Sequence, residues 1–331
     1  MKEFTFLRNN LDDWQRLEIV VDNADSESPD TLAEAYTKLT GDLAFARSHY
    51  PNSRITLYLN GLCATLHRRI YGTRREPWKR ILTFWTREVP MTMYENRKLL
   101  LASFIVAVVS TLIGIVSQML DPEFCRIILG DRYVDMTLGN IANGKPMAVY
   151  SGESEAPMFL SITINNVWVS FSMFASGLLT SIATGWYLFQ NLVMLGCFET
   201  FFAQHGLLVE SLLAVFLHGT LEISAIIIAA AAGFAMGNGW LFPGTYPRLE
   251  SFRRGAKRGA KIIVGTIPIF IVAGFIEGFV TRHTEIPDAL RLTIIILSLA
   301  FIIGYFVILP YRLAHKKNNE TKKNEKEYGF L

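Results

Sequence analysis

A small set of polar side chains lies within long apolar stretches of the sequence, where only a specific role would keep them. His218 and Glu222 are four residues apart in FLHGTLEISAIIIAAAAG, and Glu277 lies in GFIEGF. An ionisable group inside a bilayer costs about 2.5 kcal/mol or more on insertion scales. We expect one polar cluster inside the membrane, formed by His218, Glu222, Glu277, Asn165, Asn166 and Asn191.

Three kinds of chemistry suit this cluster. Residues four apart project from one helix face, so His218 and Glu222 can act together. They can form hydrogen bonds between helices, carry protons or ions, or bind a metal with Glu277 as a third ligand of a type that zinc accepts. Depth counts against the metal, because Glu277 lies near the outer end of its expected helix and His218 about two turns inside. A kink at Pro268 would reduce that mismatch.

The sequence gives no positive sign of an enzyme. The HxxxE pair lacks the second histidine of HExxH, no nucleophile motif accompanies it, and no Walker A sequence occurs. We therefore predict no cofactor other than a possible metal ion, with His218, Glu222 and Glu277 as its candidate ligands. We also expect no nucleic-acid partner.

Long helices in lipid are the elements that must position these side chains. Of the 331 residues, 51% are hydrophobic and 18% are charged, and the apolar runs begin at Leu99. A helix crosses the hydrocarbon with roughly 20 apolar residues, and only helices or closed barrels satisfy their backbone there. The fold class predicted is an all-α, polytopic membrane helix bundle. Its six expected helices are 99–120, 158–182, 185–202, 207–236, 262–280 and 290–309.

Small residues within these helices predict close helix contacts. Gly185, Gly196, Gly219 and Gly233 lie in the expected third and fourth helices. Glycine lets two helix backbones approach, so we expect these four positions at helix crossings. Such packing is compatible with a homo-oligomer.

Charge distribution predicts the orientation of the helices. Basic clusters precede the first helix, fill the loop 237–261 and follow the sixth helix, whereas the loop 121–157 has six acidic and three basic residues. Cytoplasmic segments carry the excess of Lys and Arg. We therefore expect a cell (inner) membrane protein with both termini in the cytoplasm. The basic clusters can also bind anionic lipid.

The sequence divides into three expected regions. Residues 1–96 have helical apolar spacing, as at Trp14, Leu17 and Val21, and predict a cytoplasmic domain of three or four helices. Residues 97–310 form the transmembrane domain, and 311–331 a basic cytoplasmic tail. Residues 81–90 have the aromatic and basic character of an interfacial segment. The acidic start of the chain indicates no cleavable signal peptide.

Several motifs together resemble the stage II sporulation protein M family. They are the pair Asn165–Asn166, QNLVMLG ending at Gly196, HGTLEISAIIIAAAAG from His218 to Gly233, and FIEGF around Glu277. The resemblance implies an integral membrane protein. Its named member takes part in septal-membrane remodelling during sporulation, in a complex with peptidoglycan-degrading enzymes. Many relatives occur in organisms that do not sporulate, often beside AAA-type ATPases, and the long N-terminal region places this chain in that broader branch.

Three functions follow as hypotheses. The first is a non-enzymatic membrane scaffold that recruits cytoplasmic and envelope proteins through its N-terminal domain and loops. The second is a transporter or permease-like subunit that uses the intramembrane His and Glu residues. The third is an intramembrane metal-binding protein. The expected partners are membrane lipid and other proteins, with an AAA-type ATPase or envelope proteins implied by the resemblance.

Overall fold

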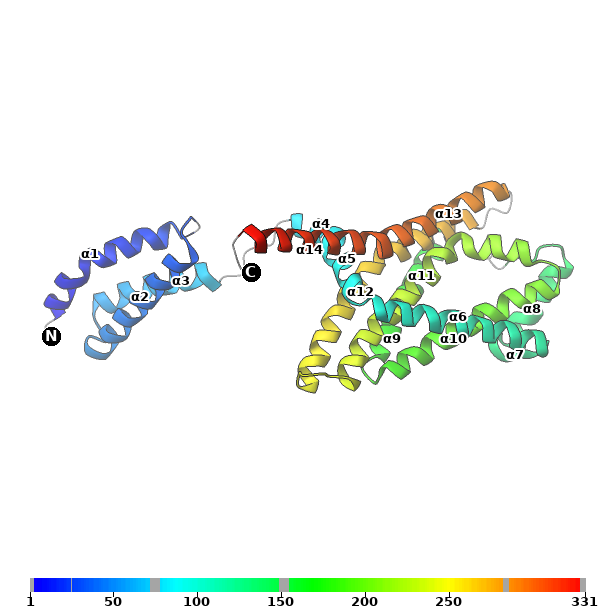
Figure 1. The fold of residues 1–331 in the computed structure, drawn as a ribbon, viewed down its shortest axis with the longest axis horizontal. Coiled ribbons are helices and arrows are strands. Elements are labelled where there is room, and N and C mark those ends of the chain that lie inside the picture. Colours follow the sequence, from blue (N-terminus) through cyan, green and yellow to red (C-terminus); the bar gives the residue numbers. More distant parts are fainter. Residues whose placement is uncertain (1–2, 25, 72–77, 149–154, 282–285, 328–331) are drawn as a thin grey trace. The chain divides into compact units, whose positions relative to one another are not determined.

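The computed structural model describes residues 3–24, 26–71, 78–148, 155–281 and 286–327 (Figure 1). Every regular element within these ranges is a helix. The chain divides into two compact units, Met1–Pro77 and Trp78–Leu331. The sequence also predicts a break after the last N-terminal helix at Gly72–Trp78, and residues 72–77 of that segment lie outside the described part of the chain.

The first unit is a three-helix domain with its own core. It consists of α1 (Glu3–Asp22), α2 (Pro29–His49) and α3 (Arg54–Tyr71). Trp14, Leu39, Leu59 and Leu66 are fully buried between the helices. The indole Nε1 of Trp14 donates a hydrogen bond of 2.8 Å to Asp42 Oδ2, so even the polar edge of this core residue is satisfied.

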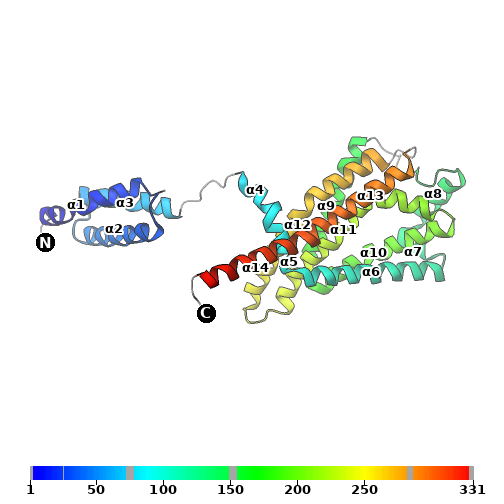
Figure 2. The ribbon, with the colours of Figure 1, turned by 45° about the horizontal axis from the view of Figure 1, so that its top comes forward.

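The second unit holds the remaining helices, which Figure 2 shows from a second direction. It begins with three short elements that precede the first long helix. In chain order its elements are α4 (Lys79–Thr83), η1 (Phe84–Glu88), α5 (Val89–Glu95), α6 (Arg97–Leu120), α7 (Phe124–Leu129), α8 (Asp131–Ala142), α9 (Glu155–Ser176), α10 (Ser181–Gln204), α11 (Leu208–Leu241), α12 (Arg248–Ile276), η3 (Glu277–Thr281), α13 (Asp288–Ile303), η4 (Gly304–Ile308) and α14 (Leu309–Glu327). The elements labelled η are π-helical turns.

Five helices of the described chain are long and apolar enough to cross a membrane. They span 97–120, 157–176, 208–241, 248–281 and 288–316, and they match five of the six expected segments. The remaining expected segment is α10, a continuous helix of 24 residues. Polar residues such as Gln190, Asn191 and Glu199 lower its hydropathy. The membrane helix bundle is therefore confirmed, with α10 as a sixth long helix packed inside it.

Helix α11 is the centre of this bundle. It packs against α6, α9, α10, α12 and α13, and most of its residues from 228 to 237 are buried. Outer helices instead expose large apolar side chains, such as Leu101, Phe104 and Ile105 on α6. A helix that is apolar on its exposed side is typical of contact with lipid.

The unit boundary lies earlier than the expected end of the N-terminal domain at residue 96. Residues from Trp78 onward belong to the second unit because they pack on its membrane helices. The ammonium of Lys261 on α12 forms an ion pair of 2.6 Å with Glu88, and Val89 lies directly against Gly265. These contacts fix η1 and α5 to α12.

The segment 237–261, expected as a loop, is mostly helical. Helix α11 continues to Leu241 and α12 begins at Arg248, which leaves only 242–247 between them. The basic segment 248–261 continues as a helix because it contains no proline and packs on α11 through Gly255 and Gly259. A Cβ at either glycine would collide with a carbonyl oxygen of α11, so the extension still packs closely.

Candidate intramembrane polar site

Three of the expected ionisable residues meet inside the bundle. One ligand atom from each of His218, Glu222 and Glu277 lies within 4.8 Å of the others. His218 Nε2 is 3.7 Å from Glu277 Oε2, a separation of charge-bearing atoms without a hydrogen bond between them. The arrangement therefore places two carboxylates and an imidazole around one common point.

The depth mismatch expected for Glu277 is absent, since a carboxylate oxygen of Glu277 lies within 4.8 Å of a ligand atom of both His218 and Glu222. Helix α11 has 34 residues and is about 50 Å long, well over the roughly 30 Å of hydrocarbon, so the start of the helix does not fix the depth of His218. In addition, the α-helix of α12 gives way to the π-helical turn η3 at Glu277. The kink residue considered in the sequence, Pro268, lies inside α12 without ending it.

A π turn explains how Glu277 comes to face α11. Such a turn holds one extra residue, which rotates the side chains that follow relative to a regular α-helix, and π turns are common at functional sites. Here the turn runs from Glu277 to Thr281. Both ends of it contribute to the site, since Thr281 also contacts His218.

Hydrogen bonds orient two of the three groups. Asn166 Nδ2 on α9 donates to Glu222 Oε1. Thr281 Oγ1 lies 3.2 Å from His218 Nδ1 and donates its own proton to the carbonyl of Ile276 at 3.3 Å. With that proton committed, the threonine oxygen can accept from the tautomer of His218 that carries its proton on Nδ1.

The site is enclosed. The side chains of His218 and Glu277 expose only 6% and 12% of their surface. In the described part of the chain, no Lys or Arg forms an ion pair with Glu222 or Glu277. Two carboxylates held this close in an apolar setting cannot both remain charged without a proton or a cation between them.

Two expected members of the cluster lie elsewhere. Asn165 is exposed on α9, because only one of two consecutive helical residues can face α11. Asn191 Nδ2 donates to the carbonyl of Tyr187 one turn earlier on α10. The structure thus retains Asn166 at the site and separates Asn165 and Asn191 from it.

Of the four glycines expected at helix crossings, two lie at close contacts between helices and two do not. A Cβ at Gly196 would collide with the carbonyl of Thr111 on α6, and one at Gly233 would lie 2.6 Å from Thr184 of α10. Both are true helix crossings. A Cβ at Gly219 would meet only side chains of its own helix, and at Gly185 it would make an ordinary contact with Phe234.

Two polar features of the bundle were not assigned a role from the sequence. Thr281 was overlooked, although its position four residues after Glu277 is the kind of spacing that marks a shared face. The second feature is a set of polar contacts away from the site. Gln118 of α6 donates to Gln204 of α10 at 2.9 Å, and Ser211 donates to Glu199 at 2.8 Å.

A pocket of about 430 Å³ reaches the edge of the site. Thr281 forms part of its lining, together with the charged residues Glu210, Asp288 and Arg291. Since Thr281 contacts His218 directly, this pocket brings polar surroundings to within one side chain of the cluster.

Comparison with known families covers most of the chain. The profile of the family described as Stage II sporulation protein M matches residues 100–282. A domain of unknown function, DUF8413, matches residues 5–72. No curated protein and no solved structure gives a significant match. The first match spans more than half of the sequence and includes all the residues of the polar site, and so the chain belongs to the stage II sporulation protein M family of membrane proteins.

Proposed function

We propose that this protein binds a divalent metal ion within the membrane, with His218, Glu222 and Glu277 as the ligands. The observation that carries the proposal is the convergence of one ligand atom from each residue within 4.8 Å. His218 and Glu222 lie on α11, and Glu277 lies at the far end of the next long helix, more than 50 residues later in the sequence. Random polar substitution would rarely bring them together, because each buried group is costly.

Charge balance supports a cation at this point. Two carboxylates together carry two negative charges when ionised, which one divalent ion neutralises. A neutral imidazole completes three protein ligands, the number found in zinc sites that keep one position open. Mixed imidazole and carboxylate donors suit zinc, iron or manganese better than calcium or magnesium. Asn166 and Thr281 would hold Glu222 and His218 in position, as outer-shell groups do around other metals.

Elemental analysis of the full chain tests the proposal. The protein is purified without chelator, and the metal content of wild type is compared with His218→Ala and Glu277→Gln. We expect about one ion per chain in wild type and its loss in both variants. Glu199→Gln is a matched control, since it neutralises a buried carboxylate of the same bundle outside the site.

The metal proposal would be refuted by two results together: the purified wild-type protein contains no metal, and added zinc or manganese does not change its melting temperature. If such a protein supported proton or ion flux in proteoliposomes, and Glu222→Gln abolished it, the transporter hypothesis would replace it. Unchanged flux in Glu222→Gln would remove the basis of that hypothesis as well.

A second proposed role is that of a scaffold in the inner membrane. It is supported by apolar side chains exposed on the N-terminal unit, which has a complete core of its own. Phe4 and Ile19 on α1 are 72% and 61% exposed, and Leu57 on α3 is 72% exposed. Exposed apolar groups on a water-soluble domain often mark protein contacts. The partners would be cytoplasmic proteins, such as the AAA-type ATPase implied by the resemblance, with envelope proteins meeting the segment 121–157.

Pull-down in mild detergent tests the scaffold. Wild type is compared with the double variant Phe4→Ser/Ile19→Ser, and with Arg8→Ser/Gln15→Ser as a control on exposed polar positions of the same helix. We expect a stoichiometric partner to be retained by wild type and the control, and lost from the apolar variant. Recovery of the protein alone under several solubilising conditions would contradict this role.

A further inference from the structure

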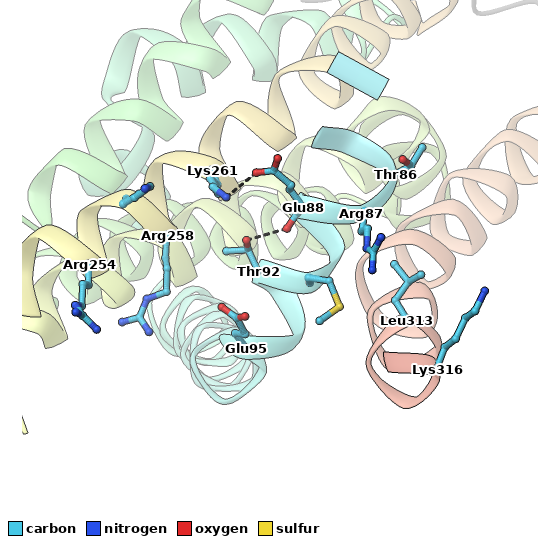
Figure 3. Close-up of a pocket in the computed structure, with 12 residues that line it drawn as sticks. Thr86, Arg87, Glu88, Thr92, Glu95, Arg254, Arg258, Lys261, Leu313 and Lys316 are labelled. Carbon is cyan, nitrogen blue, oxygen red and sulfur yellow. Dashed lines mark hydrogen bonds and ion pairs between the residues drawn. The ribbon is translucent and has the colours of Figure 1, made fainter. Parts of the chain in front are cut away.

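A strongly basic pocket of about 870 Å³ lies in the second unit, at the end of α12 remote from Glu277 (Figure 3). Three segments line it: residues 86–95, the start of α12, and α14. Figure 3 shows the helix that carries Glu88, Thr92 and Glu95 in the centre, with the side chains of α12 on one side of it and those of α14 on the other. Its six basic residues are Arg87, Arg254, Lys257, Arg258, Lys261 and Lys316.

The spacing of residues on α12 builds most of this pocket. Positions 254, 257, 258 and 261 follow the i, i+3, i+4, i+7 pattern and therefore share one face of the helix. Gly255 and Gly259 lie between them in sequence, and on another side of α12 they allow its backbone to pack closely against α11. The basic face is thus fixed in direction by the packing of the glycine face.

Most of the positive charge in the pocket is uncompensated. Glu88 is paired with Lys261, and Arg254 Nε contacts Glu250 at 2.7 Å. The ammonium of Lys261 donates a hydrogen bond to Glu88 and lowers the pKa of that carboxyl, so the pair is maintained at neutral pH. Arg87, Lys257, Arg258 and Lys316 have no acidic partner within the described chain, and only Glu95 adds another negative charge.

The position of the pocket indicates where its ligand comes from. Lys261 is the last charged residue before the apolar stretch 262–276, so the pocket opens where α12 leaves the hydrocarbon. Tyr94 and Tyr311 lie nearby with their rings 5.3 Å apart, and aromatic residues of this kind mark the headgroup layer. A separate apolar groove of about 650 Å³ begins at the same level, with Arg97 and Lys98 in its lining.

We propose that this pocket binds a phosphate-bearing anion, supplied by the headgroups of anionic phospholipids in the membrane. Guanidinium and ammonium groups together suit phosphate, with arginine providing paired donors and lysine a compact charge. The volume is far larger than one phosphate requires, which favours a headgroup with more than one phosphate or with a bulky substituent. Basic pockets on the cytoplasmic side of membrane helices are a recognised form of lipid recognition.

Lipid binding by the full chain tests the proposal. The protein is placed in nanodiscs of phosphatidylcholine, with or without a minor fraction of diphosphatidylglycerol, and lipid retention is measured by native mass spectrometry. We expect wild type to retain diphosphatidylglycerol and to melt at a higher temperature in its presence. In Lys257→Gln/Arg258→Gln the apparent affinity should fall on the order of thirtyfold, since the two basic residues near the surface together contribute about 2 kcal/mol.

The matched control is Arg248→Gln/Arg253→Gln. It removes two exposed basic residues from the same helix outside the pocket, so the net charge changes equally. Retention equal to wild type in the control supports a defined site. An equal loss in both double variants would show general surface attraction and overturn the proposal.

A soluble arm separates the two sources of phosphate. Inorganic pyrophosphate is added to the protein in phosphatidylcholine nanodiscs, and the melting temperature is followed. The lipid source is supported if pyrophosphate does not shift the melting temperature, at concentrations that also leave diphosphatidylglycerol bound in the nanodiscs that contain it. A shift that depends on Lys257 and Arg258, without selective lipid retention, would overturn the lipid assignment. None of these substitutions touches His218, Glu222 or Glu277, so the outcome is independent of the metal test.

Discussion

Asn166 and Thr281 matter at the residue scale because each holds one member of the polar site in position. Asn166 donates to one oxygen of Glu222, and Thr281 contacts Nδ1 of His218. Substituting either partner should therefore alter the site without removing any of its charged groups.

The first prediction concerns Glu222. Glu222→Gln keeps an oxygen that accepts from Asn166 and should preserve folding. Glu222→Leu leaves the Asn166 amide without its acceptor in an apolar setting, which should cost about 1–3 kcal/mol. Thermal unfolding in detergent, in the presence of chelator to exclude metal effects, measures the difference. Equal melting temperatures for the two variants would contradict the role of this hydrogen bond.

A second prediction concerns pH and Tyr58 in the N-terminal unit. Its hydroxyl donates to Glu18 at 2.8 Å, and burial together with this hydrogen bond raises the pKa of Tyr58 to about 12. An unfolded tyrosine ionises near 10. The stabilisation is therefore complete below about pH 10 and is lost as the pH rises toward 12.

Tyr58→Phe provides the measurement. Below about pH 10 the variant should be less stable than wild type by about 1 kcal/mol, the usual net value of such a hydrogen bond. Above that pH the two melting curves should converge. If the difference in stability between wild type and Tyr58→Phe stays constant up to pH 12, ionisation of Tyr58 is not the cause of the pH dependence.

The sequence allowed the three central residues to be chosen, because ionisable groups in apolar helices are few. It did not distinguish Asn166 from Asn165, since adjacent residues on a helix differ by 100° and the facing direction was unknown. Asn191 was expected in the cluster for its polarity alone. It instead bonds to its own helix, an option open to any asparagine one turn after a carbonyl.

At the scale of elements, π-helical turns were the main feature absent from the prediction. Residues 84–88, 277–281 and 304–308 form such turns. Their apolar pattern does not differ visibly from that of an α-helix, so hydrophobic periodicity could not reveal them. The helices themselves were predictable because length and hydropathy suffice in a membrane.

Glycine crossings give the third prediction. Gly196→Ala should destabilise the bundle by about 1–3 kcal/mol, because its Cβ would collide with the backbone of α6 at Thr111. Gly219→Ala should be neutral or slightly stabilising, since alanine favours helix and meets no other helix there. Melting temperatures of the two variants in the same detergent measure this. An equal fall in melting temperature in both variants would indicate that the space at the helix crossing does not determine the loss of stability.

At the scale of the whole molecule, the two units present different surfaces to their surroundings. The N-terminal unit has a charged exterior with a few exposed apolar residues, whereas the second exposes apolar side chains along its long helices. The division at Pro77 was not evident from composition, which changes near Leu99 instead. Polar residues 78–96 looked soluble, but their packing on α12 assigns them to the membrane-embedded unit.

The fourth prediction is the topology. Six crossings, including α10, place both chain ends in the cytoplasm and α7–α8 outside, in agreement with the distribution of basic residues. Fusion of a reporter to each terminus should give cytoplasmic activity. A cysteine introduced at Arg132 should react with a membrane-impermeant thiol reagent from outside, while one at Arg248 should not. An external carboxyl-terminal reporter would refute six crossings.

Because the turn at Glu277–Thr281 holds one additional residue, the polar site is unusually sensitive to the deletion of a single codon. Removing one of residues 278–280 would restore a regular α-helix and rotate the positions beyond the deletion by about 100° about the helix axis. The surrounding helices would still span the same thickness. A loss of three nucleotides would thus separate Thr281 from His218 and leave a membrane protein of normal length and hydropathy. Relatives that keep every ligand but lack this one residue would be expected to have lost the function along with the geometry.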